Sequence, residues 1–242
     1  PLSAIRFVGL SNYWEIFTIF DNRLFPALFN NFVLLLWLFV CSAIGSKLSS
    51  TVSVRTLVRA GLTVSTVAIL VLIATVDPQL SDAGFALSMA LLGVGMGLIV
   101  SQQGNVVQSS VDASGRGEAG GLQYTGQQLG SSVGVALIGA IVFAGLTNVF
   151  VQAVESDERI APEVVQQFGV AAGDGIDFVP SDQLAAAAID AGIDDVSAAA
   201  IVEDYEDAQL RALKTGLLVT AVLALLSRMS TRHLPAQVGT NT

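Results

Sequence analysis

Carboxamide side chains gather near the middle of this sequence, on two apolar segments joined by a polar turn at 112–121. Such groups do not ionise at neutral pH, but each donates and accepts hydrogen bonds. Inside a membrane they must pair with other helices or with water, because every unpaired group is costly there. The amides form one set on each segment: Gln102, Asn105 and Gln108 on the first, and Gln123, Gln127 and Gln128 on the second.

Helical spacing places the members of each set close together. Gln102, Asn105 and Gln108 follow one face of a helix, and Gln123 shares a face with Gln127. In an antiparallel helix pair joined at 110–120, both sets reach a similar depth. Two interpretations stay open: the amides hold helices together by hydrogen bonds, or they line a transport pathway.

Glycines accompany both amide sets at helical spacing. Gly126, Gly130 and Gly134 recur every four residues and lie along one helix face, which predicts close approach of a neighbouring backbone. On the first segment, Gly93 and Gly97 lie on one side and Gly95 on the other. This second group indicates either a packing groove or a hinge.

The sequence lacks the residue patterns of an enzyme. It has one cysteine, Cys41, and one histidine, His233, and no nucleophile–base arrangement. We therefore expect no catalytic residues, no metal site and no cofactor. No charged residue lies deep within the first four apolar spans, so any proton-coupling group is expected outside this chain.

Composition predicts an integral membrane protein. Of the 242 residues, 52% are hydrophobic and 13% charged, and the mean hydropathy is +0.67. The net charge of −9 comes from one segment, 148–210, which holds fourteen Asp and Glu against one Arg. No basic stripe is present, which excludes nucleic acid as an expected partner.

The apolar pattern predicts an all-α fold with five transmembrane helices, at about 27–45, 57–76, 83–107, 118–146 and 212–229. The expected regions are an aromatic interfacial segment (1–26), a four-helix membrane region (27–147), an acidic extracytoplasmic loop (148–210), and the last transmembrane helix with a cytoplasmic tail (211–242). Within the loop, short capped helices are expected to begin at Ser181 and Ser197.

The basic residues of the first connection predict the orientation in the membrane. Lys47, Arg55 and Arg59 occur there without an acidic residue, and Lys and Arg favour cytoplasmic loops. We therefore expect a multi-pass protein of the cytoplasmic membrane, surrounded by lipid, with its N-terminus outside and its C-terminus inside.

From about 44 to 235 the sequence resembles the C-terminal part of major facilitator superfamily transporters, of the fourteen-span drug:proton antiporter type. LSSTVSVRTLVRAGL is similar to that family's L-x-x-R-x-G-x-R loop, with Leu48 and Arg55 matching and Thr51 and Ser53 departing from it. The stronger matches are GVGMGLIVSQQGNVVQSSV, RGEAGGLQYTGQQLGSSVGVALIG, the long loop ending in DYEDAQLRALK, and a terminal LP.

This resemblance implies a partial transporter that, when complete, exports drugs or other amphipathic organic molecules by proton coupling. Its expected partners are a small-molecule substrate and a missing N-terminal transporter half, which carries the family's coupling motifs. The amide positions would then contribute to helix packing and to part of the pathway.

The first 40 residues instead resemble a sugar-type ABC transporter permease, through FVGLSNYWEIFT and the Asn30-Asn31 pair before an apolar span. The permease coupling loop EAAxxDGA is not matched, since Glu118-Ala119 is followed by two glycines. A fusion or mis-joined sequence would explain both resemblances. The alternatives to the facilitator are therefore an ABC permease subunit for sugars and an accessory membrane protein that binds a partner through its acidic loop.

Overall fold

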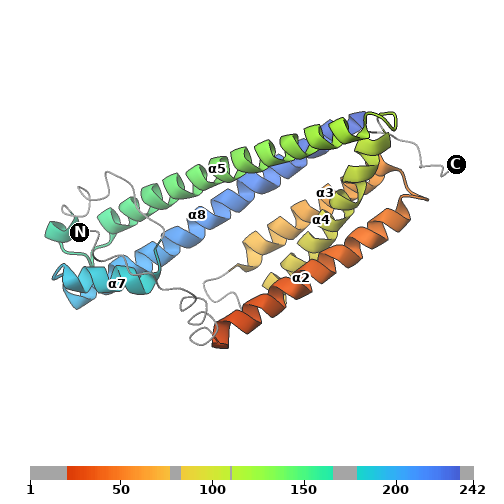
Figure 1. The fold of residues 1–242 in the computed structure, drawn as a ribbon. Coiled ribbons are helices and arrows are strands. Elements are labelled where there is room, and N and C mark those ends of the chain that lie inside the picture. The colour runs from red at the N-terminus through yellow and green to blue at the C-terminus, as the bar shows by residue number, and fades with distance from the viewer. Residues whose placement is uncertain (1–20, 77–82, 110, 166–178, 235–242) are drawn as a thin grey trace, which may run out of the picture.

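The chain is a helical, multi-pass membrane protein (Figure 1). The computed structural model describes residues 21–76, 83–109, 111–165 and 179–234, and no strand occurs among them. Five of its helices are long and apolar enough to cross a membrane, which confirms the predicted fold class. The helices are α2 (Asp21–Leu48), α3 (Val54–Thr75), α4 (Ala83–Ser109), α5 (Arg116–Ser156), α7 (Ser181–Asp190) and α8 (Asp195–Ser230), followed by the short η3 (Thr231–His233).

Helices α2, α3 and α4 form a three-helix layer with α4 in contact with both others. Most large side chains on α2 point outward, including Phe29, Leu35 and Phe39, each at least 66% exposed. An outward apolar surface of this kind suits contact with lipid chains. At the start of α3, the hydroxyl of Ser53 accepts a hydrogen bond from the backbone N–H of Thr56, which caps the helix.

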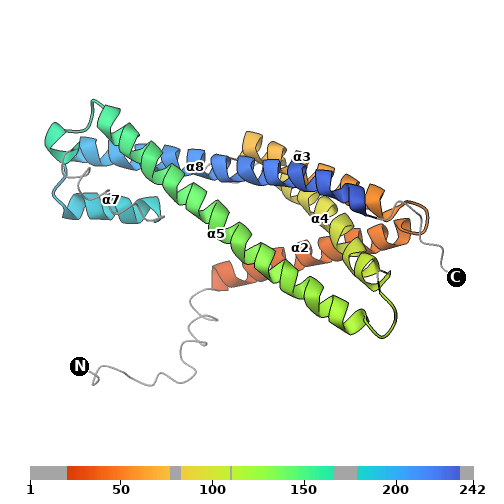
Figure 2. The ribbon, with the colours of Figure 1, turned by 90° about the horizontal axis from the view of Figure 1, so that it is seen from above.

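The two longest helices, α5 and α8, pack against each other. They contain 41 and 36 residues, or roughly 60 and 54 Å at about 1.5 Å per residue, well beyond a hydrocarbon core of about 30 Å. Both continue past the predicted span limits at 146 and 212. Figure 2 shows that they lie together near α7 and separate toward the start of α5.

The last helix begins earlier than expected because Asp194 caps it. The carboxylate of Asp194 accepts hydrogen bonds from the backbone N–H groups of Val196 (3.1 Å) and Ser197 (3.0 Å). The short loop helix predicted at Ser197 is therefore the first part of α8, continuous with the membrane span. The other predicted loop helix, beginning at Ser181, is present as α7, but the predicted side-chain cap is wrong: Pro180 is the N-cap residue and no side chain caps the helix.

The main buried cluster lies where α5 and α8 meet near α7. Phe150 and Tyr205 are fully buried there, and their rings form an edge contact with centroids 5.1 Å apart. The Tyr205 hydroxyl accepts a hydrogen bond from the Val179 N–H (2.7 Å) and donates one to the Val179 carbonyl (3.1 Å). The segment 148–210 therefore has its own core, built on extensions of two membrane helices.

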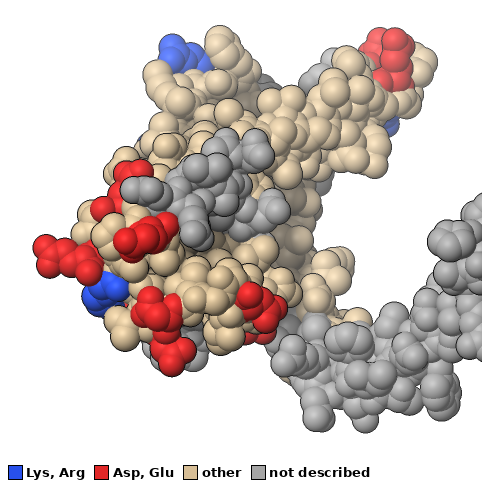
Figure 3. Space-filling model, turned by 90° about the vertical axis from the view of Figure 1, so that its left-hand side faces the viewer, with Lys and Arg blue, Asp and Glu red and all other residues tan. Residues whose placement is uncertain are grey.

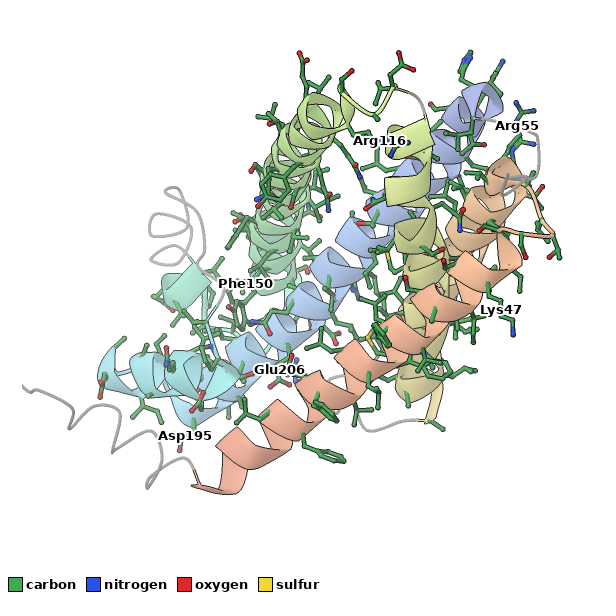
Figure 4. All side chains as sticks on the ribbon, turned by 45° about the vertical axis from the view of Figure 1, so that its right-hand side comes forward. Lys47, Arg55, Arg116, Phe150, Asp195 and Glu206 are labelled. Atoms are coloured by element: carbon green, nitrogen blue, oxygen red, sulfur yellow. The ribbon has the colours of Figure 1, made fainter. Side chains whose placement is uncertain are left out.

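Charge separates the two ends of the molecule. Lys47, Arg55 and Arg116 lie at one end, which we call the basic end, whereas Asp195 and Glu206 lie at the other (Figure 4). Several separate patches of Asp and Glu side chains lie on this second end, which we call the acidic end (Figure 3). The interfacial segment predicted at 1–26 falls mostly outside the described residues, and 21–26 already belong to α2.

Candidate functional site

The predicted amide sets meet at a pocket of about 280 Å³ near the basic end. Helices α3, α4 and α5 and the residue after η3 form its walls. The lining amides are Gln102, Gln103, Gln123 and Gln127, and the apolar lining residues are Val58, Ile99, Val106, Val107 and Leu234. None of these nine side chains is ionisable, so the pocket offers hydrogen bonds and apolar contact but no acid, base or nucleophile.

Gln102 is the only fully buried glutamine in the described part of the chain. Its amide nitrogen donates to the Gly45 carbonyl of α2 (3.2 Å) and to the Ser101 hydroxyl (2.9 Å). Its amide oxygen is buried and has no hydrogen-bond partner among the described residues. If the amide nitrogen and oxygen were exchanged, the oxygen would face the Gly45 carbonyl oxygen, and two acceptors cannot form a hydrogen bond. The hydrogen-bond network therefore fixes the orientation of the amide.

The remaining predicted amides are placed differently from one another. Gln123 is half-buried and Gln127 is exposed, and both line the pocket. The neighbouring Gln128 is exposed and does not line it. Asn105 and Gln108 belong to α4, but their side chains lie outside the described part of the structure. The pocket thus joins one amide of α4 from the predicted set to two of α5.

Two arginines of α3 hold the C-terminal wall of the pocket. Arg55 donates from Nε (2.9 Å) and Nη2 (2.6 Å) to the Leu234 carbonyl. Arg59 donates from Nε to the Thr231 hydroxyl (2.9 Å). In the sequence, both arginines indicate orientation, and Arg55 also matches the facilitator loop. The contacts join residues more than 170 positions apart, and no local pattern predicts them.

The glycines of α4 face both of its neighbours. A Cβ built at Gly97 would lie 2.6 Å from the Cys41 Cβ of α2, and one at Gly93 would lie 2.6 Å from the Trp37 ring. On the opposite side, a Cβ at Gly95 would lie 2.8 Å from the Gly61 carbonyl oxygen of α3. Gly95 and Gly97 therefore occur where helix backbones approach closely, whereas Gly93 leaves space for the Trp37 ring.

The three predicted packing glycines of α5 contact no such neighbour among the described residues. A Cβ at Gly126, Gly130 or Gly134 would meet no atom within 4 Å among the described residues. Large apolar side chains around them are also open, with Leu129 63% and Val133 65% exposed. The close packing predicted for this face remains a prediction, because no described helix of this chain supplies it.

Sequence reasoning missed other packing glycines. A Cβ at Gly45 of α2 would lie 2.5 Å from the Ser101 hydroxyl oxygen, and one at Gly216 of α8 would lie 2.5 Å from a methyl group of Val142. Each is a single glycine within an apolar run, so neither forms a recognisable motif. Only the position of the partner helix reveals their role.

A second cavity, of about 560 Å³, lies at the acidic end between α5 and α8. Arg159 forms ion pairs there with Asp157 (2.6 Å) and Glu203 (2.7 Å). Its guanidinium lowers the pKa of Asp157 through hydrogen bonds. Burial, reinforced by nearby carboxylates, raises the pKa of Asp204, whose Oδ2 is buried without a hydrogen-bond partner in the described chain.

Comparison with known proteins gives no relative: no family model, no curated protein and no solved structure matches this chain. The function must therefore be argued from the geometry of the two ends and from the sequence.

Proposed function

We propose that this chain is part of a membrane transporter of the major facilitator type, which exports amphipathic organic molecules by proton coupling. The observation that supports this best is the amide-lined pocket between α3, α4 and α5. Apolar walls with a few placed polar groups are typical of sites for small organic molecules. The lack of ionisable groups in the lining suits binding and passage better than chemistry.

The open face of α5 supports a partial transporter rather than a self-sufficient bundle. Gln127 and Gln128 are exposed on the same part of α5 as Gly126 and Gly130. In contact with lipid chains, the polar groups of these amides would lack partners at a substantial cost in free energy. We propose that the other half of the transporter covers this face, with the glycines allowing close helix contact.

The charge distribution supports an orientation with the basic end in the cytoplasm. Lys47, Arg55 and Arg116 all lie at that end (Figure 4), in agreement with the preference of Lys and Arg for the cytoplasmic side. In the proposed orientation, the N-terminus lies outside the cell and the C-terminus lies inside. The acidic end then projects from the outer surface of the membrane.

An efflux experiment tests the transport proposal. Cells that express the complete reading frame containing this chain are loaded with ethidium, a cation, or with N-phenyl-1-naphthylamine, an uncharged dye. We expect faster loss of at least one dye than from vector-only cells, and we expect an uncoupler that collapses the proton gradient to abolish the difference. Equal efflux in expressing and control cells overturns the proposal.

The same experiment separates the alternatives. Efflux that survives the uncoupler but stops on depletion of ATP contradicts the facilitator and favours an ATP-driven permease. For the accessory alternative, the Asp and Glu side chains of the acidic end (Figure 3) supply negative charge that a cationic partner could contact. Absence of efflux together with specific capture of a cationic partner by the complete chain would favour that function.

A further inference from the structure

We propose that the amide-lined pocket binds an uncharged, mainly apolar molecule that carries one hydrogen-bond donor, and that this donor pairs with the Oε1 atom of Gln102. The inference deepens the proposed function, on which it rests for the biological role of the ligand. Its physical basis is independent, because it follows from the atoms that surround the pocket.

The unpaired amide oxygen of Gln102 determines the need for a donor. Both hydrogen atoms of its amide nitrogen have acceptors, at Gly45 and Ser101, whereas the oxygen has none among the described residues. A buried acceptor without a partner is unfavourable, and an N–H or O–H group of a ligand would relieve that cost. Gln102 belongs to the pocket lining but is fully buried in this structure, so a ligand group reaches its oxygen only when the neighbouring lining side chains shift.

The lining determines the charge of the ligand. An ion entering the pocket would lose its hydration and find no opposite charge among the described lining residues. Arg55, which contacts the lining residue Leu234, already directs two nitrogen atoms at its carbonyl, and Arg59 donates to the Thr231 hydroxyl. A neutral molecule therefore fits this environment better than an anion or a cation.

The size of the pocket limits the ligand further. Its volume of about 280 Å³ lies near the lower limit of the roughly 300–1,000 Å³ observed for small-molecule sites. Val106, Val107 and Ile99 contribute apolar walls. A compact molecule of two or three rings matches this space, whereas a peptide or a sugar rich in hydroxyl groups would leave polar groups unpaired.

Three related probes test the inference on the purified complete chain in phosphatidylcholine nanodiscs. Tritiated N-phenyl-1-naphthylamine has one N–H donor, its N-methyl derivative has none, and 8-anilino-1-naphthalenesulfonate adds a negative charge to the same rings. We expect saturable binding of the first probe, about tenfold weaker competition by the N-methyl derivative, and no competition by the sulfonate. Equal competition by either analogue, or no saturable binding, overturns the inference.

Substitution of Gln102 locates the donor contact. Gln102→Met removes the acceptor, so we expect the tenfold preference for the N–H probe to disappear. The matched control Gln128→Met, outside the lining, keeps the preference. Retention of the preference in Gln102→Met contradicts the inference. The readout is a ratio of two affinities in the same sample, and partial loss of folded protein does not change it.

A second pair of variants covers the case in which Gln102→Met does not fold. Val107→Trp fills the pocket, whereas Val100→Trp places the same side chain on the exposed surface of α4. We expect only Val107→Trp to abolish saturable binding, and equal binding by both variants contradicts the location.

Binding without cellular efflux would refute the proposed function alone, whereas efflux without donor-dependent binding would refute this inference alone.

Discussion

Replacement of Gly95 by alanine tests the packing of α4 against α3. The new Cβ would lie 2.8 Å from both the Gly61 carbonyl oxygen and the Ser65 backbone nitrogen, and it would also overlap the Ser65 hydroxyl. Ordinary contacts of a Cβ start at 3.4 Å. Because two of the three atoms are backbone, no side-chain rotation relieves the overlap, and the helices must move apart.

A matched control variant isolates the loss in free energy of unfolding that the overlap is expected to cause. Overpacking of a close contact destabilises a protein by about 1–3 kcal/mol, but alanine also gains about 1 kcal/mol over glycine in helix propensity. Gly130→Ala has the same gain and no overlap, since no described atom lies within 4 Å of its Cβ. The difference between the two variants therefore isolates the overlap, at about 1–3 kcal/mol.

The single cysteine provides the assay. Cys41 is buried against Gly97, on the α2 side of α4, so a thiol-reactive dye reports the separation of the three-helix layer on heating. For a difference of about 2 kcal/mol we expect Gly95→Ala to unfold about 4–8 °C below Gly130→Ala. Equal unfolding temperatures would refute the close contact between α3 and α4.

Further predictions concern the acidic end. Tyr205→Phe removes the hydroxyl that bonds to both backbone groups of Val179, so we expect a loss of about 1–2 kcal/mol and faster amide hydrogen exchange at the start of α7, with unchanged exchange in α3. The pKa of Asp204 is raised by burial and by the carboxylates of Asp157, Glu203 and Asp207, against the opposing effect of Arg159. The folded state therefore holds this proton to higher pH than the unfolded chain, and stability falls as pH rises through the raised pKa. We expect Asp204→Asn to match the wild type below the ordinary carboxyl pKa and to exceed it in unfolding temperature at neutral pH. A difference that does not change with pH would contradict the assignment.

Much of the helical framework follows from the sequence because apolar length alone decides it. Each of the five predicted spans coincides with a helix that can cross a membrane, although the second helix ends at Thr75, one residue before its predicted limit. Their ends were less predictable: α5 continues to Ser156 and α8 begins at Asp195. Alanine-rich and amphipathic stretches outside the membrane are compatible with either a loop helix or an extension, and only the shared core around Phe150 and Tyr205 favours extension.

The amides of the candidate site could be predicted from the sequence, but the residues that complete its walls could not. The connection between Ser109 and Arg116 joins α4 to α5 and brings Gln102 near the depth of Gln123 and Gln127; it is shorter than the predicted turn at 112–121, because 116–121 belong to α5. The contribution of Leu234 depends on Arg55, far away in the sequence. The separation of α5 from α8 near the basic end (Figure 2) also arises from tertiary packing, which no local periodicity encodes.

Cross-linking in membrane vesicles tests the central claim, that α4 and α5 line one pocket near the basic end. In a Cys41→Ser background, a short bifunctional thiol reagent is applied to the pair Gln103→Cys with Gln127→Cys, and to the control pair Gln103→Cys with Gln128→Cys. We expect efficient intramolecular cross-linking of the first pair, whose residues both line the pocket, and much less of the second. Equal cross-linking of both pairs, or none of the first, would contradict the account.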